Sequence, residues 1–288
     1  MSASTERESP ITTYRDFAAS SSLRSRIRMM ARGLTVQSLA AVGAVTRRSS
    51  HDGWIRFPFY HHVFDDERTG FEAQLRYLRR SGEFIDTDDA VSLMRSGSSI
   101  HGRFFCLGFD DGFKNCVTNA LPILAANDIP CTFFVATAHV GSAIEDSPRA
   151  AEQIFGPSRR HARPVELLSW DDCRQLVDAG MVIGSHTHSH ARLSRLDADG
   201  VWREMQTSKA LIEREVRRPC LHFCSPWGKP FADYLPGRDP WIARRVGFLS
   251  FHTGIRGATR AGASPFEIRR DHLLAGWGIP ELRYFLAL

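Results

Sequence analysis

The stretch that decides the fold is Phe104–Phe113, which has the sequence FFCLGFDDGF. Its apolar run is typical of a strand in a parallel sheet, because such strands are covered on both faces. Asp110 and Asp111 follow this run, and in α/β folds functional residues gather where strands end. Gly112 permits a sharp turn that would bring both carboxylates into one cavity. Taken alone, however, the same three residues are also typical of an ordinary turn.

A second stretch favours a functional site over a simple turn. Residues 184–190 have the sequence GSHTHSH and follow another apolar run, at 181–183. They are therefore also expected at the end of a buried strand. Two histidines and one carboxylate from separate strand ends are the ligand set of a catalytic metal site that leaves one position for water.

The composition is that of a globular protein. The chain has 288 residues, of which 43% are hydrophobic and 24% are charged, and this length suffices for one large core with a small extra segment. Its six cysteines include no CxxC pair, which favours reduced thiols in a reducing compartment. The formal net charge of +5 favours anionic surroundings, but no nucleic-acid-binding module accompanies it. We therefore expect no nucleic-acid partner.

The sequence shows no membrane span and no secretory signal. Its longest apolar run, at 34–45, is interrupted by polar residues and is shorter than the roughly 20 residues of a span. Glu6, Glu8 and Asp16 precede this run, and no small-residue cleavage site follows it. We therefore expect a protein of the cytoplasm or one bound peripherally at the inner membrane, and translocation by an unusual route stays open.

The first 50 residues are expected to lie outside the main domain. Residues 1–22 are rich in Ser, Thr and charge, which predicts disorder. Residues 23–50 predict a basic amphipathic helix and a linker, because apolar residues and arginines each recur at helical spacing over residues 23–34. This helix could pack on the domain as an ordinary surface helix, or residues 23–34 could contact an anionic membrane surface.

Residues 51–288 are expected to form one domain in which strands and helices alternate. Strands are predicted at 54–63, 83–85, 104–110, 131–136, 181–185, 220–224, 248–253 and 266–270. Helices are predicted at 71–81, 86–95, 114–127 (with a kink or late start at Pro122), 170–179, 201–216 and 241–246. This alternation predicts an α/β fold with a parallel sheet that is closed or nearly closed. The polar stretch 141–165 is expected to be an insertion, either a solvated basic loop or a lid over an anionic substrate.

Three motifs occur in order along the chain: GFDDG at 108–112, SHTHSH at 185–190 and SPWG at 225–228. Together they resemble the NodB-type polysaccharide deacetylases of carbohydrate esterase family four, over a region that runs from Trp54 to the C-terminus. The resemblance implies a distorted (β/α)-barrel, here with an N-terminal helical extension, and an enzyme that hydrolyses the N-acetyl group of an amino sugar. It also implies a divalent metal, usually Zn2+, with Co2+ or Ni2+ as alternatives.

The resemblance assigns roles residue by residue. Asp111, His186 and His190 match the metal ligands of the family, and Asp110 matches its base. His188 is left without a role. These roles suit amide hydrolysis, because metal coordination can lower the pKa of bound water to ~7 and a neighbouring carboxylate can take the proton.

The acid that protonates the leaving amine has no clean match near the C-terminus, where neither His252 nor His272 fits the family pattern. The motif FYHHV at 59–63 instead resembles the circularly permuted branch of the family, which includes exopolysaccharide de-N-acetylases. This resemblance makes His61 the candidate acid, in preference to its neighbour His62. The alternative is that His61 merely ends a strand.

Two further expectations come from the family pattern. Many members carry an arginine before Pro-Trp-Gly, where this chain has a cysteine and a serine. The permuted branch often carries another arginine late in the chain, and Arg270 is the better match to it, so we expect Arg270 to orient Asp110. Trp227, with Pro226, is expected to form an aromatic wall for a sugar ring, and plain core packing is the alternative for Trp227.

The leading hypothesis is therefore a metal-dependent hydrolase that removes N-acetyl groups from a polysaccharide or oligosaccharide containing amino sugars. The alternatives are a deacylase of a small or lipid-linked amino-sugar intermediate, a non-catalytic carbohydrate-binding protein and a metal-dependent phosphoesterase. The intact motif residues disfavour the non-catalytic alternative, and the lack of additional carboxylates for a second metal disfavours the phosphoesterase. The sequence leaves the saccharide, the native metal and the oligomeric state open.

Overall fold

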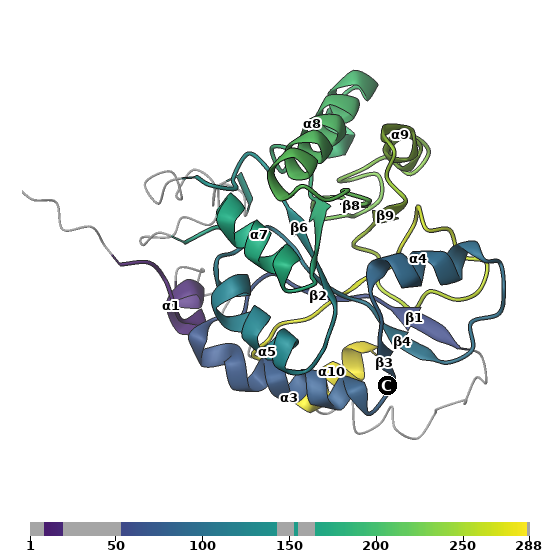
Figure 1. The fold of residues 1–288 in the computed structure, drawn as a ribbon. Helices are drawn as coiled ribbons and strands as arrows, with labels where there is room; N and C mark the ends of the chain where they lie inside the picture. The colour runs from purple at the N-terminus through teal and green to yellow at the C-terminus, as the bar shows by residue number, and fades with distance from the viewer. Residues whose placement is uncertain (1–8, 20–52, 143–152, 155–164, 287–288) are drawn as a thin grey trace, which may run out of the picture.

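The structure is a computed structural model that describes residues 9–19, 53–142, 153–154 and 165–286 (Figure 1). The helix and linker predicted at 23–50, including the basic segment 23–34, lie outside these residues, as does most of the insertion predicted at 141–165. Among the helices of the described ranges, none combines the length and the apolar character that crossing a membrane requires.

The centre of the molecule is a curled sheet of seven parallel strands in the order β10-β2-β5-β6-β7-β8-β9 (Figure 1). These strands are β2 (Pro58–Tyr60), β5 (Leu107–Phe109), β6 (Cys131–Val135), β7 (Val182–Ser185), β8 (His222–Cys224), β9 (Ser250–His252) and β10 (Asp271–His272). The last strand lies at 271–272 rather than at the predicted 266–270, where Ile268 forms an isolated bridge with His252 of β9. Because this bridge brings the chain back from β9 towards β10, the sheet curls into most of a barrel. The expected distorted (β/α)-barrel is confirmed.

Two of the predicted strands are each divided between two sheets. The strand expected at 54–63 breaks after Arg56 into β1 (Trp54–Arg56) and β2, and the strand expected at 104–110 breaks at Cys106 into β4 (Arg103–Phe105) and β5. β1 and β4 form a small parallel sheet with β3 (Glu83–Phe84). At the break, the Cys106 amide donates a hydrogen bond to the Arg56 carbonyl (2.9 Å). Both segments therefore leave the small sheet and enter the barrel side by side.

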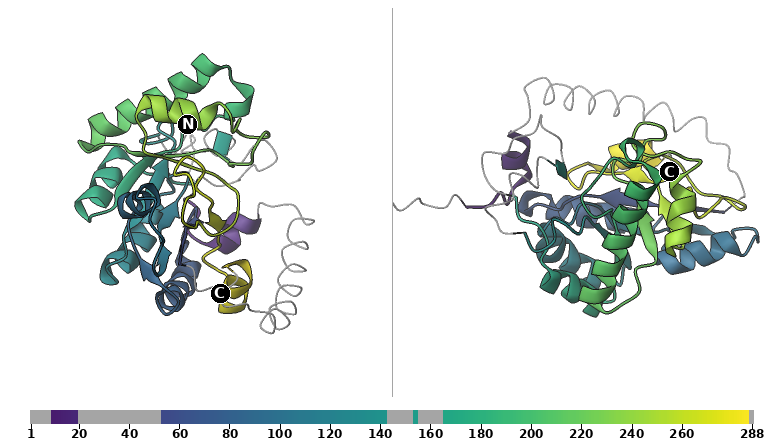
Figure 2. Two further views of the ribbon diagram at one scale, coloured as in Figure 1. Left: turned by 90° about the vertical axis from the view of Figure 1, so that its right-hand side faces the viewer. Right: turned by 90° about the horizontal axis from the view of Figure 1, so that it is seen from above.

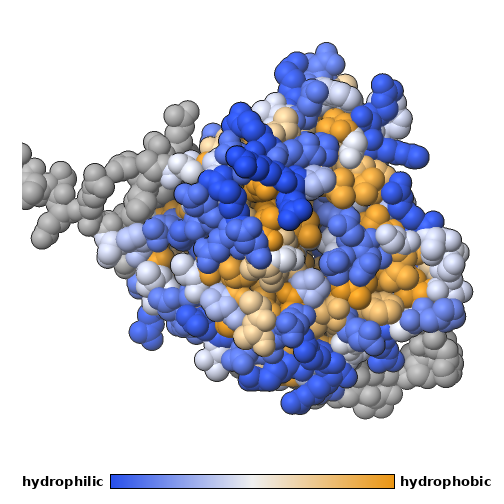
Figure 3. Space-filling model, in the orientation of Figure 1, coloured by the Kyte–Doolittle hydropathy of each residue, from blue (hydrophilic) through white to orange (hydrophobic). Residues whose placement is uncertain are grey.

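Helices cover the outer side of the curled sheet (Figures 1 and 2). They are α3 (Arg68–Arg79), α4 (Thr87–Arg95), α5 (Leu121–Ala126), α7 (Trp170–Asp178), α8 (Ala198–Val216), α9 (Asp239–Val246) and α10 (Ile279–Leu286). The expected capping box of α7 is present, with Ser169 and Asp172 each bonded to the backbone of the other. The expected late start at Pro122 is also found, because α5 begins with this proline in its first turn, after a π-helical turn at Cys116–Ala120. Polar residues cover most of the face shown in Figure 3, with apolar residues between them.

The disorder predicted for residues 1–22 is wrong for one part of that stretch. A short helix, α1 (Tyr14–Ala19), packs against the loop that follows β2. Ile11 and Phe17 are buried in the main hydrophobic core, and the Asp66 carboxylate accepts hydrogen bonds from backbone amides at the start of the helix. Burial of two large apolar side chains outweighs the polar composition around them.

Gln74 of α3 joins the first strand of the barrel to the C-terminal segment. Its fully buried side chain accepts a hydrogen bond from the Tyr60 hydroxyl (2.6 Å). Its amide group donates to three backbone carbonyls, those of Leu274 (2.9 Å), Ala275 (3.1 Å) and Trp277 (2.8 Å). The segment after β10 is therefore held against the helix that follows β2.

We expect the substitution Gln74→Leu to lower the free energy of unfolding by about 1–3 kcal/mol, because it leaves the Tyr60 hydroxyl and the backbone carbonyls buried without a partner. Chemical denaturation followed by circular dichroism measures this change. Arg76→Gln on the same helix is the control, since Arg76 pairs with Glu72 at the surface (2.8 Å) and such pairs contribute only about 0.2–0.5 kcal/mol. Equal losses in the two variants would contradict the role of Gln74.

Candidate active site

The carboxyl ends of three strands bring the predicted site residues together. His61 follows β2, Asp110 and Asp111 follow β5, and His186 follows β7. In a parallel sheet these strand ends meet at one edge, where α/β proteins place their binding sites. The two aspartates and His186 are buried, whereas His61 is partly exposed.

Asp110 is held by a buried ion pair with Arg270. Its two carboxylate oxygens accept hydrogen bonds from Nη1 and Nη2 of Arg270, both at 2.8 Å, and Nε of Arg270 donates to the Thr253 carbonyl (3.0 Å). The guanidinium also lies 3.9 Å from the centre of the Phe59 ring. Burial alone raises the pKa of Asp110, but Arg270 and His186 more than offset this effect, so the pKa lies below its ordinary value. The carboxylate is therefore ionised and fixed in orientation.

Cys224 lies beside this ion pair, in the part of the chain where many family members carry an arginine. Its Sγ atom is 3.8 and 3.9 Å from the two carboxylate oxygens of Asp110. Burial raises the pKa of Cys224, so the side chain is a neutral thiol and a weak donor. All six cysteines of the chain are described, buried and free of disulfides.

Asp111, His186 and His190 form a compact group in which one ligand atom of each lies within 4.8 Å of the others. Oδ1 of Asp111 is 3.4 Å from Nε2 of His186 and 3.2 Å from Nε2 of His190. Nδ1 of His186 donates to the Cys224 carbonyl (2.9 Å), which directs Nε2 towards Asp111. Burial alone lowers the pKa of His186, but Cys224 and the Asp110 and Asp111 carboxylates raise it well above its ordinary value. Burial alone raises the pKa of Asp111, but His61 and the two histidines of the group lower it well below its ordinary value.

This set of donors fits a divalent metal ion such as zinc, because one carboxylate and two imidazoles leave further coordination positions open. His188, the middle histidine of the motif, is not part of the group, since its Nδ1 lies 2.9 Å from the Thr137 hydroxyl. A second group that includes Asp110 and Cys224 is equally compact. The Asp110 oxygens are already paired with Arg270, however, so the group around Asp111 is the better metal site.

The backbone of the site is strained. Four of its non-glycine residues have positive φ angles, namely Asp111 (71°), Thr187 (65°), His190 (58°) and Trp227 (55°). Such residues cost of order 1–3 kcal/mol each and cluster at functional sites. The turn that the sequence suggested at Gly112 thus begins one residue earlier, at Asp111.

The candidate acid, His61, has both ring nitrogens near polar groups. Its Nε2 is 3.8 Å from Oδ2 of Asp111, and its Nδ1 is 3.0 Å from Nε2 of His272. Burial lowers the pKa of His61, although the nearby carboxylates act in the opposite direction, so an imidazolium at this position gives up its proton readily. The neighbouring His62 instead pairs with Glu67 (3.0 Å).

Trp227 stands at the edge of the site. The centre of its ring is 4.5 Å from that of His190, and the Arg192 guanidinium lies 4.3 Å from the ring. The side chain is 40% exposed, which does not match plain core packing. Pro226 is itself buried, and its carbonyl accepts a hydrogen bond from the Gly228 amide (2.6 Å).

His272 is a site residue to which the sequence analysis gave no role. It meets His61 although the two are 211 positions apart, and no local motif reports such a contact. The signal that could have identified it is its spacing of two residues from Arg270, because alternate residues of an extended strand point to the same side.

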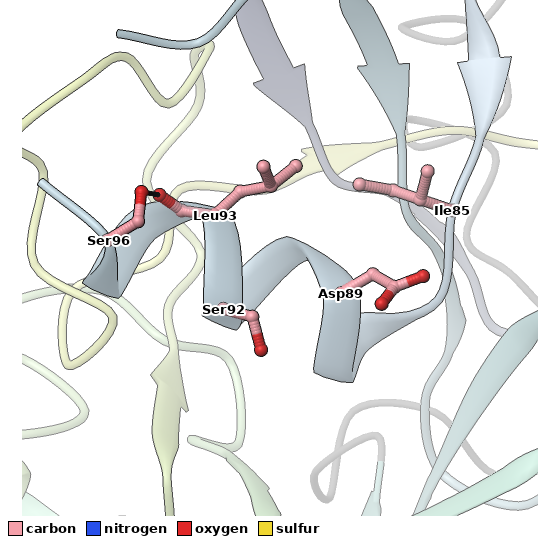
Figure 4. A pocket seen from close by; sticks show the side chains of 5 residues that line it. All are labelled: Ile85, Asp89, Ser92, Leu93 and Ser96. Carbon is pink, nitrogen blue, oxygen red and sulfur yellow. Dashed lines mark hydrogen bonds between the residues drawn. The ribbon is translucent and has the colours of Figure 1, made fainter. Parts of the chain in front are cut away.

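A surface pocket of about 360 Å³ lies outside the site (Figure 4). It is formed mostly by α4 and is lined by Ile85, Asp89, Ser92, Leu93 and Ser96. None of the candidate site residues lines this pocket. We therefore assign it no part in the chemistry.

A model of the polysaccharide deacetylase family matches residues 99–237. This segment contains Trp227, Asp110 and the compact group around Asp111, whereas His61 and Arg270 lie outside it. Among curated proteins, the poly-β-1,6-N-acetyl-D-glucosamine N-deacetylase of Staphylococcus aureus (strain MRSA252) is 24% identical over 150 residues, which is 51% of this chain. The match covers only 44% of the length of that relative.

Several solved structures share the fold. IcaB from Ammonifex degensii has a TM-score of 0.64 and 22% identity, with 77% of this chain and 92% of that chain covered. The Streptococcus pyogenes deacetylase PplD has a TM-score of 0.61 and 18% identity, with 82% and 98% covered. The deacetylase domain of BpsB from Bordetella bronchiseptica has a TM-score of 0.58 and 20% identity, with 76% and 96% covered. Residues 99–237, with the three ordered motifs, therefore match the polysaccharide deacetylase family, and the barrel is the fold of these solved structures.

Proposed function

We propose that this protein is a metal-dependent deacetylase that removes N-acetyl groups from an amino-sugar-containing polysaccharide or oligosaccharide. The observation that carries the proposal is the compact group of Asp111, His186 and His190 next to Asp110, a carboxylate that Arg270 holds in place. The name of the S. aureus relative specifies β-1,6-linked N-acetylglucosamine, and a chain of such sugars is the substrate class that we propose here. The deacetylase domain would comprise residues 51–288.

Asp111, His186 and His190 would hold the metal, for which we propose Zn2+, with Co2+ or Ni2+ as alternatives. When bound, such an ion polarises a carbonyl and lowers the pKa of water, and both effects favour amide hydrolysis. The ionised Asp111 carboxylate is in the protonation state that ligation requires. The pKa of His186 lies well above its ordinary value without metal, so metal binding would release a proton from this histidine.

Asp110 acts as the general base in this proposal. Its ionised carboxylate accepts a proton from the attacking water as the new C–O bond forms. Arg270 binds both oxygens, so the carboxylate keeps one orientation while the proton moves.

His61 acts as the general acid. An amine leaves poorly as an anion, so a proton must reach its nitrogen as the C–N bond breaks. The Nδ1 atom of His61 is engaged with His272, which leaves Nε2, on the side of Asp111, to deliver that proton. The base and the acid thus come from the ends of two neighbouring strands, β5 and β2.

Trp227 provides an aromatic face for a sugar ring. The side chain is exposed beside His190, and its contact with Arg192 limits its movement. We include Pro226 in this sugar-binding surface because it directly precedes Trp227, whose backbone has a positive φ angle.

We also propose a location in the cytoplasm or at the inner membrane, with a peripheral membrane contact that the basic spacing of residues 23–34 supports. A lipid-linked or small amino sugar is the alternative substrate. A lipid-linked substrate predicts activity that depends on lipid vesicles, and a small substrate predicts activity on single sugars. Activity that increases with the number of linked sugars and is independent of vesicles favours the polysaccharide.

The central test is acetate release from oligomers of β-1,6-linked N-acetylglucosamine. We expect release by the zinc-loaded protein, and a decrease in kcat of at least about 10²-fold in Asp110→Asn, because a positioned base contributes typically 10²–10⁴-fold. Zinc content should be unchanged in this variant. Binding of the oligomers by the zinc-loaded protein without any acetate release would instead support the non-catalytic alternative.

The metal site is tested by two histidine variants of the same motif. We expect His190→Ala to lose bound zinc and acetate release, because two ligands cannot replace three. We expect His188→Ala to keep both, since His188 contacts Thr137 instead. Elemental analysis after dialysis measures the zinc content. Equal zinc loss in the two variants would contradict the assignment of His190, rather than His188, as a metal ligand.

The aromatic wall is tested with two exposed tryptophans. We expect Trp227→Ala to raise KM for the oligomers roughly threefold to tenfold, which corresponds to about 1 kcal/mol of lost stacking. Trp241 on α9 is 58% exposed, and Trp241→Ala should leave KM unchanged. Steady-state kinetics on the oligomers measures both, and an unchanged KM in Trp227→Ala would remove Trp227 from the site.

A further inference from the structure

His272 reaches the candidate acid from the last strand of the barrel. β10 pairs with β2, so that His272 lies opposite Phe59, and the Leu273 amide donates to the Phe59 carbonyl (2.9 Å). On the other side, Nη2 of Arg256 donates to the His272 carbonyl (2.6 Å). The backbone of His272 is therefore fixed by hydrogen bonds on both sides.

The two imidazoles meet at a single hydrogen bond. Nδ1 of His61 and Nε2 of His272 are 3.0 Å apart, and the rings are nearly perpendicular, with centres 4.7 Å apart and planes at 87°. The Phe59 ring lies against both, 5.6 Å from the ring of His61 and 5.0 Å from that of His272. These contacts hold the His61 ring with its Nε2 on the side of Asp111.

We propose that His272 is a positioning residue for His61, an inference that rests on the proposed function of His61 as the acid. When His61 carries both of its protons, its Nδ1–H must donate to an acceptor, and Nε2 of a neutral His272 is that acceptor. The other proton, on Nε2 of His61, then points to the reacting centre. It passes to the leaving amine as the C–N bond breaks, and the Nδ1 proton stays on His61, bonded to His272.

The surroundings keep His272 in the form that this role requires. Burial lowers the pKa of His272 well below its ordinary value, and His61, Arg256 and Arg270 act in the same direction. The ring is therefore neutral, with one nitrogen free to accept.

The test compares two substrates and two variants of His272 in the full-length, zinc-loaded protein. Acetate release from β-1,6-linked N-acetylglucosamine oligomers needs an acid for the amine, whereas 4-nitrophenyl acetate has a leaving group that departs without protonation. We expect His272→Leu to lower kcat for the oligomers about 10- to 100-fold, by analogy with residues that orient metal-ligating histidines. Ester hydrolysis, KM and zinc content should change little.

Two further measurements separate positioning from a structural effect. His272→Gln should restore most of the oligomer activity, because its Oε1 is again an acceptor. In a His61→Ala background, His272→Leu should cause no further loss, since a residue that acts through His61 has nothing left to position. His101→Leu, at an exposed position, is the control and should match the wild type.

Each contrary result has a distinct meaning. Equal loss of ester and oligomer hydrolysis, loss of zinc, or an undiminished effect in the His61→Ala background would overturn the positioning role while leaving the deacetylase intact. Unchanged oligomer activity in His272→Leu would also overturn the positioning role. A wild-type protein that releases no acetate from any saccharide would overturn the proposed function and this inference with it.

Discussion

The buried ion pair between Asp110 and Arg270 is the interaction on which the rest of the site depends. It joins the end of β5 to a segment 160 positions later in the chain. Either charge alone would be very costly to bury, whereas two short, parallel hydrogen bonds satisfy both. The pair thus fixes the carboxylate, and by holding the residues that lead into β10 it also sets where His272 meets His61.

The strained backbone of the site is a second constraint, which acts on the main chain rather than on a side chain. Asp111, His190 and Trp227 all have positive φ angles, a conformation that glycine adopts at lower cost. Glycine, however, has no carboxylate, imidazole or indole. Side-chain chemistry and backbone geometry are therefore required at the same positions, and the dense packing around the strand ends keeps these residues in the unfavourable conformation.

Those parts of the site that lie in short motifs at strand ends could be predicted from the sequence, as the compact group around Asp111 illustrates. Contacts between distant segments could not be predicted, because no local sequence pattern indicates that His61 and His272 meet. The same limit applies to the strands. An apolar run predicts burial, but it does not say that the chain changes sheets at Phe57 or Cys106. The disorder predicted near the N-terminus failed because an average over a polar stretch hides single buried side chains such as Phe17.

The pairing of β2 with β10 also determines the order in which parts of the fold can form during synthesis. During synthesis His272 of β10 emerges 211 positions after His61, which follows β2, so the ribosome must release the whole intervening segment before the two strands can meet. Bringing such distant segments together slows folding more than it weakens the folded state. A nascent chain that ends before residue 270 already contains Asp111, His186 and His190, but it lacks Arg270 and His272. The compact group around Asp111 is thus present in the growing chain before the residues that contact Asp110 and His61, so the candidate site is complete only once residue 272 has been made.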